Sequence, residues 1–202
     1  MRPATQLEQL LQLAQQMGVV TTRDIDAAGI HRQVPTRLVR SGALERIGRG
    51  RYRLPGREMT THHSLADATA AVPHGVICLI SALAFHEIGT QLPNRVWLAV
   101  ERRRRKPEVA WPPLEIIRFS GPAFTEGIET HEIEGRPVPI YGLAKTLADV
   151  FKYRNKIGLD VALEALDDAW RNRRTTVDEI VRYAKICRVD RVMRPYLESL
   201  TR

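Results

Sequence analysis

The stretch from Thr21 to Leu54 (TTRDIDAAGIHRQVPTRLVRSGALERIGRGRYRL) constrains the fold more than any other part of the 202-residue chain. It contains two short segments with helical spacing of apolar residues, a glycine break between them, and an arginine-rich segment with two glycines. Two helices joined by a tight turn and followed by a β-hairpin are the outline of a winged helix-turn-helix. The stretch therefore predicts a DNA-binding module.

The residues before and within this stretch predict three helices. Residues 5–17 place apolar side chains at three- and four-residue steps and are followed by a glycine, which is typical of a helix end. A threonine hydroxyl can cap a second helix over residues 23–28, which a glycine also closes. Ile30, Val34 and Leu38 then recur every four residues and would form the buried face of a third helix.

The polar side of the third helix is predicted to contact DNA. Arginine, glutamine and threonine can hydrogen-bond phosphates and base edges from within the major groove, which is the role of a recognition helix. The predicted contact residues on this helix are Arg32, Gln33, Thr36, Arg37 and Arg40.

Residues 43–54 are predicted to form a hairpin around Gly48 and Gly50, because glycine permits the positive backbone angles of a tight turn. An arginine at such a tip can enter a minor groove or clamp the phosphate backbone. A basic hairpin alone is more often a solvated loop, so the prediction depends on its occurrence together with the three helices. It adds to the DNA-binding set Arg46, Arg49, Arg51 and Arg53 of the hairpin and Thr22 before the second helix.

The charge of the chain supports an anionic partner. The net charge is +8 and the isoelectric point is near 10. Residues 1–56 hold nine arginines against four acidic residues, so much of the excess lies in just over a quarter of the chain. Arginine has a planar guanidinium that pairs bidentately with phosphate or guanine.

Length and composition predict two small folded domains, at residues 1–57 and 62–202. The hydrophobic fraction of 44% is sufficient for buried cores. No run approaches the roughly 18 apolar residues that a membrane helix needs, and the N-terminus lacks the layout of a signal peptide, so we expect a cytoplasmic protein without a membrane partner. Cys78 and Cys187 are expected to be reduced and packed.

The second predicted domain combines strand-like segments with helices and ends in a helical third, which makes the whole chain an α+β protein with a winged helix followed by a mixed α/β domain and a helical last third. The strand-like segments are residues 96–101, 114–119, 129–133 and 137–141, and the helical ones fall at about 143–151, 159–170, 177–185 and 190–200. Lys145 and Asp149 are predicted to pair on the outer face of the first of these helices. The run from Arg102 to Lys106 is interpreted as a solvated loop, with a second nucleic-acid contact as the alternative, and its role stays open.

No pattern in the chain argues for catalysis, so we expect a protein that is not an enzyme and has no catalytic residues, cofactor or metal. Adjacent histidines such as His62 and His63, with Asp67 nearby, point in different directions and make a poor metal site. Ser81 and His86 lie five residues apart without a nucleophile elbow. The acidic residues Asp160, Glu164, Asp167 and Asp168 are interpreted as a solvated, internally paired helix face.

Taken together, the chain resembles the AbiEi family of antitoxins from type IV, or abortive infection, toxin-antitoxin systems of phage defence. The resemblance is carried by GVVTTRDIDAAGI, RLVRSGALERIGRGRYRLP, VICLISALAFHEIGTQLP, VWLAV and PIYGLAKTLADVFKYRNKIGLDVALEALDDA, and it covers about residues 7–200. The last of these segments is the most specific.

The resemblance implies a winged helix that represses its own operon by binding duplex operator DNA, and a C-terminal domain that counteracts a cognate nucleotidyltransferase-type toxin. The family is not known for a tight complex between the two proteins. The alternatives are a winged-helix regulator with a ligand-sensing C-terminal domain and a nuclease delivered to DNA by the winged helix. The operator sequence, the oligomeric state and the mechanism of neutralisation do not follow from the residues.

Overall fold

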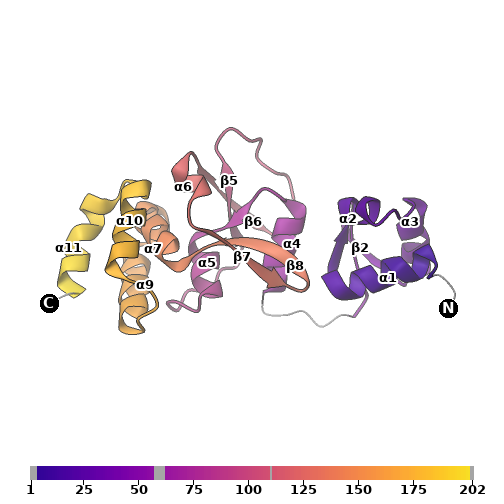
Figure 1. Cartoon of the computed structure of the whole chain (residues 1–202), viewed down its shortest axis with the longest axis horizontal. Coiled ribbons are helices and arrows are strands. Elements are labelled where there is room, and N and C mark those ends of the chain that lie inside the picture. The colour runs from indigo at the N-terminus through magenta and orange to yellow at the C-terminus, as the bar shows by residue number, and fades with distance from the viewer. Residues whose placement is uncertain (1–3, 57–61, 110, 201–202) are drawn as a thin grey trace. The chain divides into compact units, whose positions relative to one another are not determined.

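The computed structural model describes residues 4–56, 62–109 and 111–200, and it confirms the predicted α+β fold with an N-terminal winged helix and a helical C-terminal third (Figure 1). The chain divides into two compact units. The first consists of residues 1–73, 108–112 and 131–138, and the second of residues 74–107, 113–130 and 139–202. A boundary at residues 57–62 was expected, but residues 57–61 lie outside the described part of the chain. The first unit also contains segments far beyond this boundary.

The winged helix of the first unit combines three helices with a small antiparallel sheet. Its sheet has the strand order β1-β3-β2, with Val20 opposite Tyr52 and Arg46 opposite Tyr52 on the other side. The first strand of this sheet lies between the first two helices of the chain. The elements are α1 (Gln6–Met17), β1 (Val19–Thr21), α2 (Thr22–Ala27), α3 (Gln33–Arg40), β2 (Glu45–Gly48) and β3 (Arg51–Arg53).

Capping side chains fix where the first two helices begin. The Thr5 hydroxyl accepts from the Glu8 amide while the Glu8 carboxylate accepts from the Thr5 amide, and Thr21 and Asp24 repeat this capping box at α2. The helices enclose one apolar core formed by Leu10, Ala14, Val20, Ile25, Ile30, Val34, Leu38 and Leu44. Val34 and Leu38 belong to this core, which confirms them as buried residues of the third helix. Ile30 belongs to the core as well, but it lies before α3 and not on it.

The sheet of the second unit has the order β6-β5-β4-β8-β7 and is mixed. Strand β5 runs parallel to β6 and antiparallel to β4, and β4 runs parallel to β8. The tip of the β7-β8 hairpin, residues 131–138, is grouped with the first unit. The strands are β4 (Val76–Ile77), β5 (Val96–Glu101), β6 (Leu114–Phe119), β7 (Ile128–Ile133) and β8 (Arg136–Tyr141).

Helices complete the second unit, in which α7 packs against α5, α9 and α10 (Figure 1). These helices are α5 (Leu79–Phe85), α6 (Pro122–Thr125), α7 (Leu143–Lys152), α8 (Arg154–Ile157), α9 (Leu159–Arg171), α10 (Val177–Cys187) and α11 (Asp190–Leu200); α4 (His63–Ala71) belongs to the first unit. In the part of the chain that the structure describes, no helix has the length and apolar character needed to cross a membrane.

Helix α7 is buried on all sides from Leu143 to Phe151, which corrects the predicted outer location of Lys145 and Asp149. The two side chains do pair, with 2.5 Å between Nζ and Oδ2, but both are fully buried. The Lys145 ammonium also lies 4.1 Å from the centre of the Tyr141 ring, and Cys187 donates its S–H to Asp149 Oδ1. Burial raises the pKa of Asp149 above its ordinary range and that of Cys187 to about 12.

Candidate nucleic-acid interface

One face of α3 is polar and exposed. Gln33, Thr36, Arg37 and Arg40 are all exposed; Thr36 and Arg37 are adjacent, and each of the two lies three or four residues from Gln33 and from Arg40. On a helix of 3.6 residues per turn this spacing places all four on the same side, opposite the buried face. Arg37 and Arg40 lie in the last turn, where positive charge also interacts favourably with the helix dipole. The structure therefore brings together four of the five residues predicted for the recognition helix.

Arg32 lies just before α3, at its N-cap position, and is paired with an acidic residue. Its Nε and Nη2 donate to the two carboxylate oxygens of Asp26 at 3.1 and 2.9 Å. These hydrogen bonds lower the pKa of Asp26. The Arg32 side chain is nevertheless 74% exposed, so a phosphate could compete with the carboxylate for the guanidinium.

The wing is held against α2 by Thr22. The amide and the hydroxyl of Thr22 both donate to the carbonyl of Gly50, at 2.8 and 3.2 Å. Gly50 has a φ of +67°, and a Cβ on it would collide with the Thr22 hydroxyl, so this position requires glycine for both its backbone angle and its contact. Thr22 is half-buried and holds the turn of the wing at Gly50.

Two wing arginines are available at the surface. Arg46 and Arg49 are exposed, and Arg49 lies in the turn between β2 and β3. A register shift between Arg46 and Gly48 marks a bulge at this turn, and the Arg46 Nε donates to the Gly48 carbonyl at 3.2 Å. Arg53, by contrast, is half-buried and donates to Glu45 directly across the sheet at 3.0 Å.

Arg51 is not part of the exposed surface, which corrects its place in the predicted DNA-binding set. Its side chain is buried, with 6% of the residue exposed, and its guanidinium donates to the backbone carbonyls of Trp111 at 2.7 Å and Asp67 at 3.4 Å. Burial lowers the pKa of Arg51, with the nearby Asp67 acting in the opposite direction. Alternation along β3 explains the error, because Tyr52 packs on the winged-helix core and its neighbours must point to the other face.

A second charged residue, Arg136 at the tip of the β7-β8 hairpin, contacts the base of the winged helix and was missed by sequence reasoning. Its Nε donates to the Val19 carbonyl at 2.7 Å, and its Nη2 forms an ion pair with Asp24. Asp24 is also the partner of Thr21 in the capping box of α2. No local pattern could have revealed this contact, since 112 residues separate the two partners.

His63 forms a buried cluster with Asp67 and Glu134 in the same unit. Its Nδ1 lies 2.8 Å from Glu134 Oε2, and its Nε2 lies 3.5 Å from Asp67 Oδ2. Neither Asp67 carboxylate oxygen has a hydrogen-bond partner among the described residues, and burial raises the pKa of Asp67. No group of three residues able to hold a metal ion was found in the described residues.

The other candidates from the sequence have structural contacts. The Ser81 hydroxyl accepts from the Trp97 amide at 2.9 Å, whereas His86 Nε2 lies 2.8 Å from the Tyr141 carbonyl. On α9, Asp167 pairs with Arg171 of the same helix. Asp168 accepts a hydrogen bond from the backbone amide of residue 89, and Glu164 accepts one from the amide of residue 90. These contacts hold α9 against the loop after α5, and Asp160 is exposed.

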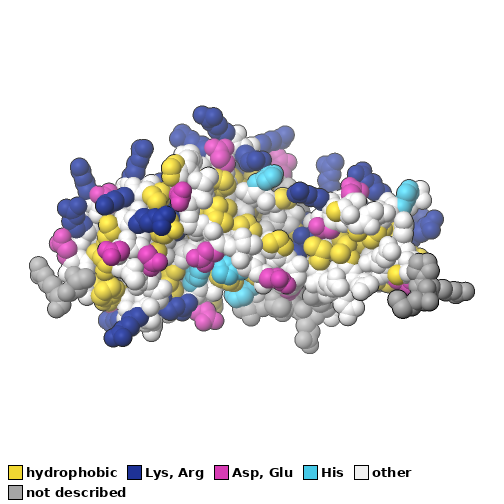
Figure 2. Space-filling model, viewed as in Figure 1, with side chains coloured by type: hydrophobic (Ala, Val, Ile, Leu, Met, Phe, Trp, Pro, Cys, Tyr) yellow, Lys and Arg dark blue, Asp and Glu magenta, His cyan; other side chains and the backbone are white. Residues whose placement is uncertain are grey.

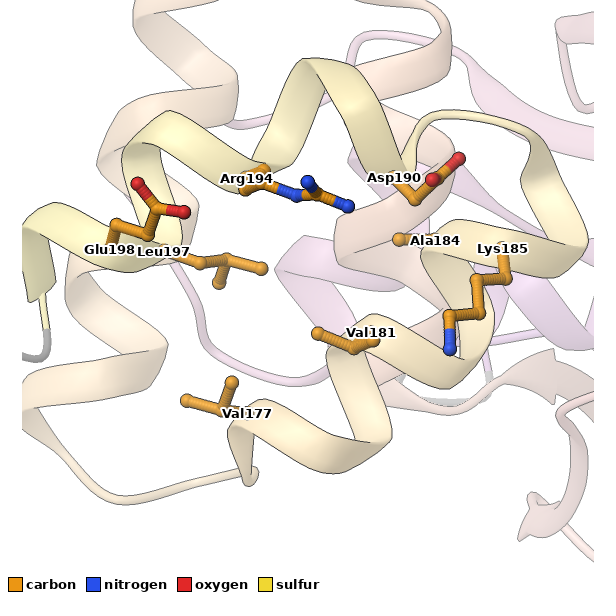
Figure 3. A pocket seen from close by; sticks show the side chains of 8 residues that line it. All are labelled: Val177, Val181, Ala184, Lys185, Asp190, Arg194, Leu197 and Glu198. Atoms are coloured by element: carbon orange, nitrogen blue, oxygen red, sulfur yellow. The ribbon is translucent and has the colours of Figure 1, made fainter.

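A cavity of about 210 Å³ lies between α10 and α11 (Figure 3). Its floor is apolar and its rim carries charges of both signs. It is lined by Val177, Val181, Ala184, Leu197, Lys185, Asp190, Arg194 and Glu198.

Comparison with known proteins finds a family match over the winged helix. Residues 8–55, from α1 to the end of the wing, match the family described as transcriptional regulator, AbiEi antitoxin, which confirms over this region the resemblance predicted from the sequence. No curated protein matches the chain. The crystal structure of the RV2827C protein from Mycobacterium tuberculosis is similar at a TM-score of 0.59 and 16% identity, covering 91% of this chain and 72% of that one. At this identity the similarity shows a shared fold.

Proposed function

We propose that this protein, whose residues 8–55 match the AbiEi antitoxin family, is an autorepressor that binds duplex operator DNA and an antitoxin that counteracts a nucleotidyltransferase-type toxin. We assign DNA binding to residues 1–57 and antitoxin activity to residues 62–202. The observation that carries the first half is the exposed face of α3, where Gln33, Thr36, Arg37 and Arg40 project from one side of a helix whose other side is packed in a core. The second half is supported by the description of the family matched over residues 8–55 as an antitoxin.

The geometry suggests a division of roles at the DNA. Helix α3 would enter the major groove, with Arg37 and Arg40 hydrogen-bonding guanine or nearby phosphates. The exposed wing residues Arg46 and Arg49 would contact the flanking backbone or minor groove. Arg32 would exchange Asp26 for a phosphate. Thr22 would position the wing, Arg53 would add charge at its edge, and Arg51 would hold the wing in place without contacting DNA.

The DNA-binding half is tested by replacing both Arg37 and Arg40 with alanine. Affinity for the DNA upstream of the gene should fall at least about tenfold, since each good arginine-guanine contact contributes about 1 to 3 kcal/mol. The control replaces two exposed arginines, Arg182 on α10 and Arg188 directly after it, with alanine, which removes the same charge from another surface. Fluorescence anisotropy with labelled duplexes measures both, and equal losses in the two variants would contradict a recognition role for α3.

The antitoxin half is tested by co-expression with the neighbouring reading frame. If that frame encodes a nucleotidyltransferase-type toxin, its expression alone should arrest growth and the full chain should restore it. The variant lacking Arg37 and Arg40 should restore growth as well, because the proposal assigns neutralisation to the other domain. Failure of the wild-type chain to restore growth would refute the antitoxin role, and would leave the anisotropy result on operator binding unaffected.

A further inference from the structure

The loop after β5 carries a dense group of positive charges that the proposed operator contact does not use. Arg102, Arg103, Arg104, Arg105 and Lys106 are consecutive and all exposed. Figure 2 shows Lys and Arg side chains gathered around this loop, which Figure 1 shows joining β5 to β6. The loop belongs to the second unit, whereas the winged helix belongs to the first. We call residues 102–106 the basic loop.

Hydrogen bonds from β6 give the first turn of the basic loop a defined backbone. Arg118 Nη1 donates to the carbonyls of both Arg102 and Arg104, at 2.5 and 3.0 Å. The Arg103 amide donates to the Glu101 carboxylate at 2.8 Å, and the Arg104 amide donates to the Glu101 carbonyl at 3.0 Å. One guanidinium thus holds two carbonyls of the loop, while the loop's own side chains remain exposed to solvent.

This arrangement concentrates five consecutive positive charges between Glu101 and Glu108. Glu101 is already engaged by the loop backbone, and Arg118 adds a further positive charge beside it. Like charges held together in this way repel one another, and a bound polyanion relieves this repulsion while the loop's cations release the counterions condensed on the polyanion. Four of the five residues are arginine, whose guanidinium pairs with phosphate bidentately. A phosphodiester backbone therefore fits the loop better than a single small anion.

We propose that the basic loop is a second nucleic-acid contact, which binds the phosphate backbone of duplex DNA without reading its sequence. This contact acts independently of the recognition helix, and the proposal does not rest on the antitoxin role. The choice of duplex DNA as its occupant rests on the DNA binding proposed for residues 1–57, which would raise the local concentration of DNA phosphates at the loop.

The test uses the full chain with Arg37 and Arg40 replaced by alanine, so that the recognition helix contributes little. In this background all five residues 102–106 are changed to glutamine together, which gives the basic-loop variant. The anchoring hydrogen bonds involve loop backbone atoms and the side chains of Glu101 and Arg118, so the substitutions leave them intact. The matched control changes five exposed cations of α10, α11 and the turn between them to glutamine: Arg182, Lys185, Arg188, Arg191 and Arg194.

Binding to a duplex of unrelated sequence is measured by anisotropy over a range of salt concentrations. The background protein should bind with a salt slope of about −0.9 per phosphate contact, and the basic-loop variant should lose at least two such contacts and about tenfold in affinity. The control variant should lose less than half as much. Equal losses in both variants would show a general charge effect and overturn the proposal, as would unchanged binding in the loop variant.

Two further arms define the partner and the structure of the loop. A structured RNA is titrated in parallel, and a loss of binding confined to RNA would overturn the assignment to DNA.

Changing Arg118 to methionine removes the anchor of the loop and only one charge, and it should weaken DNA binding more than changing the exposed Arg182 to methionine. Equal effects of these two single variants would contradict the role of the anchored loop conformation.

Discussion

At the scale of single residues, Arg49 and Arg51 are two positions apart in the wing but should behave oppositely. Changing Arg51 to methionine leaves the Trp111 and Asp67 carbonyls without their guanidinium donor, so the free energy of unfolding should fall by about 1 to 3 kcal/mol. Changing the exposed Arg49 to alanine should alter stability by less than about 0.5 kcal/mol and reduce the salt slope of DNA binding by about 0.9.

Urea unfolding and salt titration of the two wing variants measure these differences. Under conditions in which the Arg51 variant and the wild type are both fully folded, their DNA affinities should depend on salt with the same slope. If the Arg51 variant had unchanged stability but a weaker dependence of DNA affinity on salt, Arg51 would belong to the DNA-binding surface.

The buried carboxyl of Asp67 should make stability depend on pH. Because burial raises its pKa in the folded chain, the proton is held more tightly in the folded state than in the unfolded state. The protonated form therefore stabilises the fold, and this contribution is lost as the pH rises from about 4 through the raised pKa.

Asparagine at position 67 resembles the protonated form, so the Asp67→Asn variant should gain thermal stability relative to the wild type as the pH increases above about 4. Thermal unfolding across this range provides the measurement. The exposed Glu132 on β7, changed to glutamine, serves as the control and should differ from the wild type by a nearly constant amount. If the difference in thermal stability between the Asp67 variant and the wild type were also constant with pH, it would argue against a raised pKa of the Asp67 carboxyl.

At the scale of elements, α7 depends on a buried ion pair. Changing Lys145 to methionine alone leaves the Asp149 carboxylate buried without its ammonium partner, and should cost about 3 to 5 kcal/mol of unfolding free energy. Changing Asp149 to leucine in the same protein removes the uncompensated charge, so the double variant should regain most of the loss. Chemical denaturation of the single and double variants measures this. A double variant less stable than Lys145→Met would contradict the assigned pairing.

The elements also show how far the sequence determines the structure. Helices α1 and α3 and the wing were predictable, because apolar spacing, capping residues and glycines are local signals. The faces of β3 were not, since a strand with polar residues on both sides of Tyr52 carries no local sign of which side is covered. The same limit applies to α7, where Lys145 and Asp149 look like an exposed pair until the elements that surround the helix are known. Among the predicted contact residues, this limit accounts for the error at Arg51.

At the scale of the whole molecule, the first unit is assembled from three separate segments of chain. Residues 1–56 contain the winged helix but lack Arg136 and the carbonyls that hold Arg51. We expect a fragment of residues 1–56 to unfold at a lower temperature than the same helices do in the full chain. Hydrogen exchange of the α1 to α3 amides compares the two directly. Equal protection in fragment and full chain would show that the winged helix is autonomous.

The tip of the β7-β8 hairpin also has a consequence during synthesis on the ribosome. Residues 131–138 begin about 75 positions after Gly56, which closes the winged-helix segment, and at about 5 to 20 residues per second this is a delay of roughly 4 to 15 s. During that interval the nascent winged helix lacks the Arg136 contact with Asp24 and Val19. Incomplete chains released from the ribosome would then have a less stable winged helix. They would therefore compete poorly with the finished protein for the same DNA.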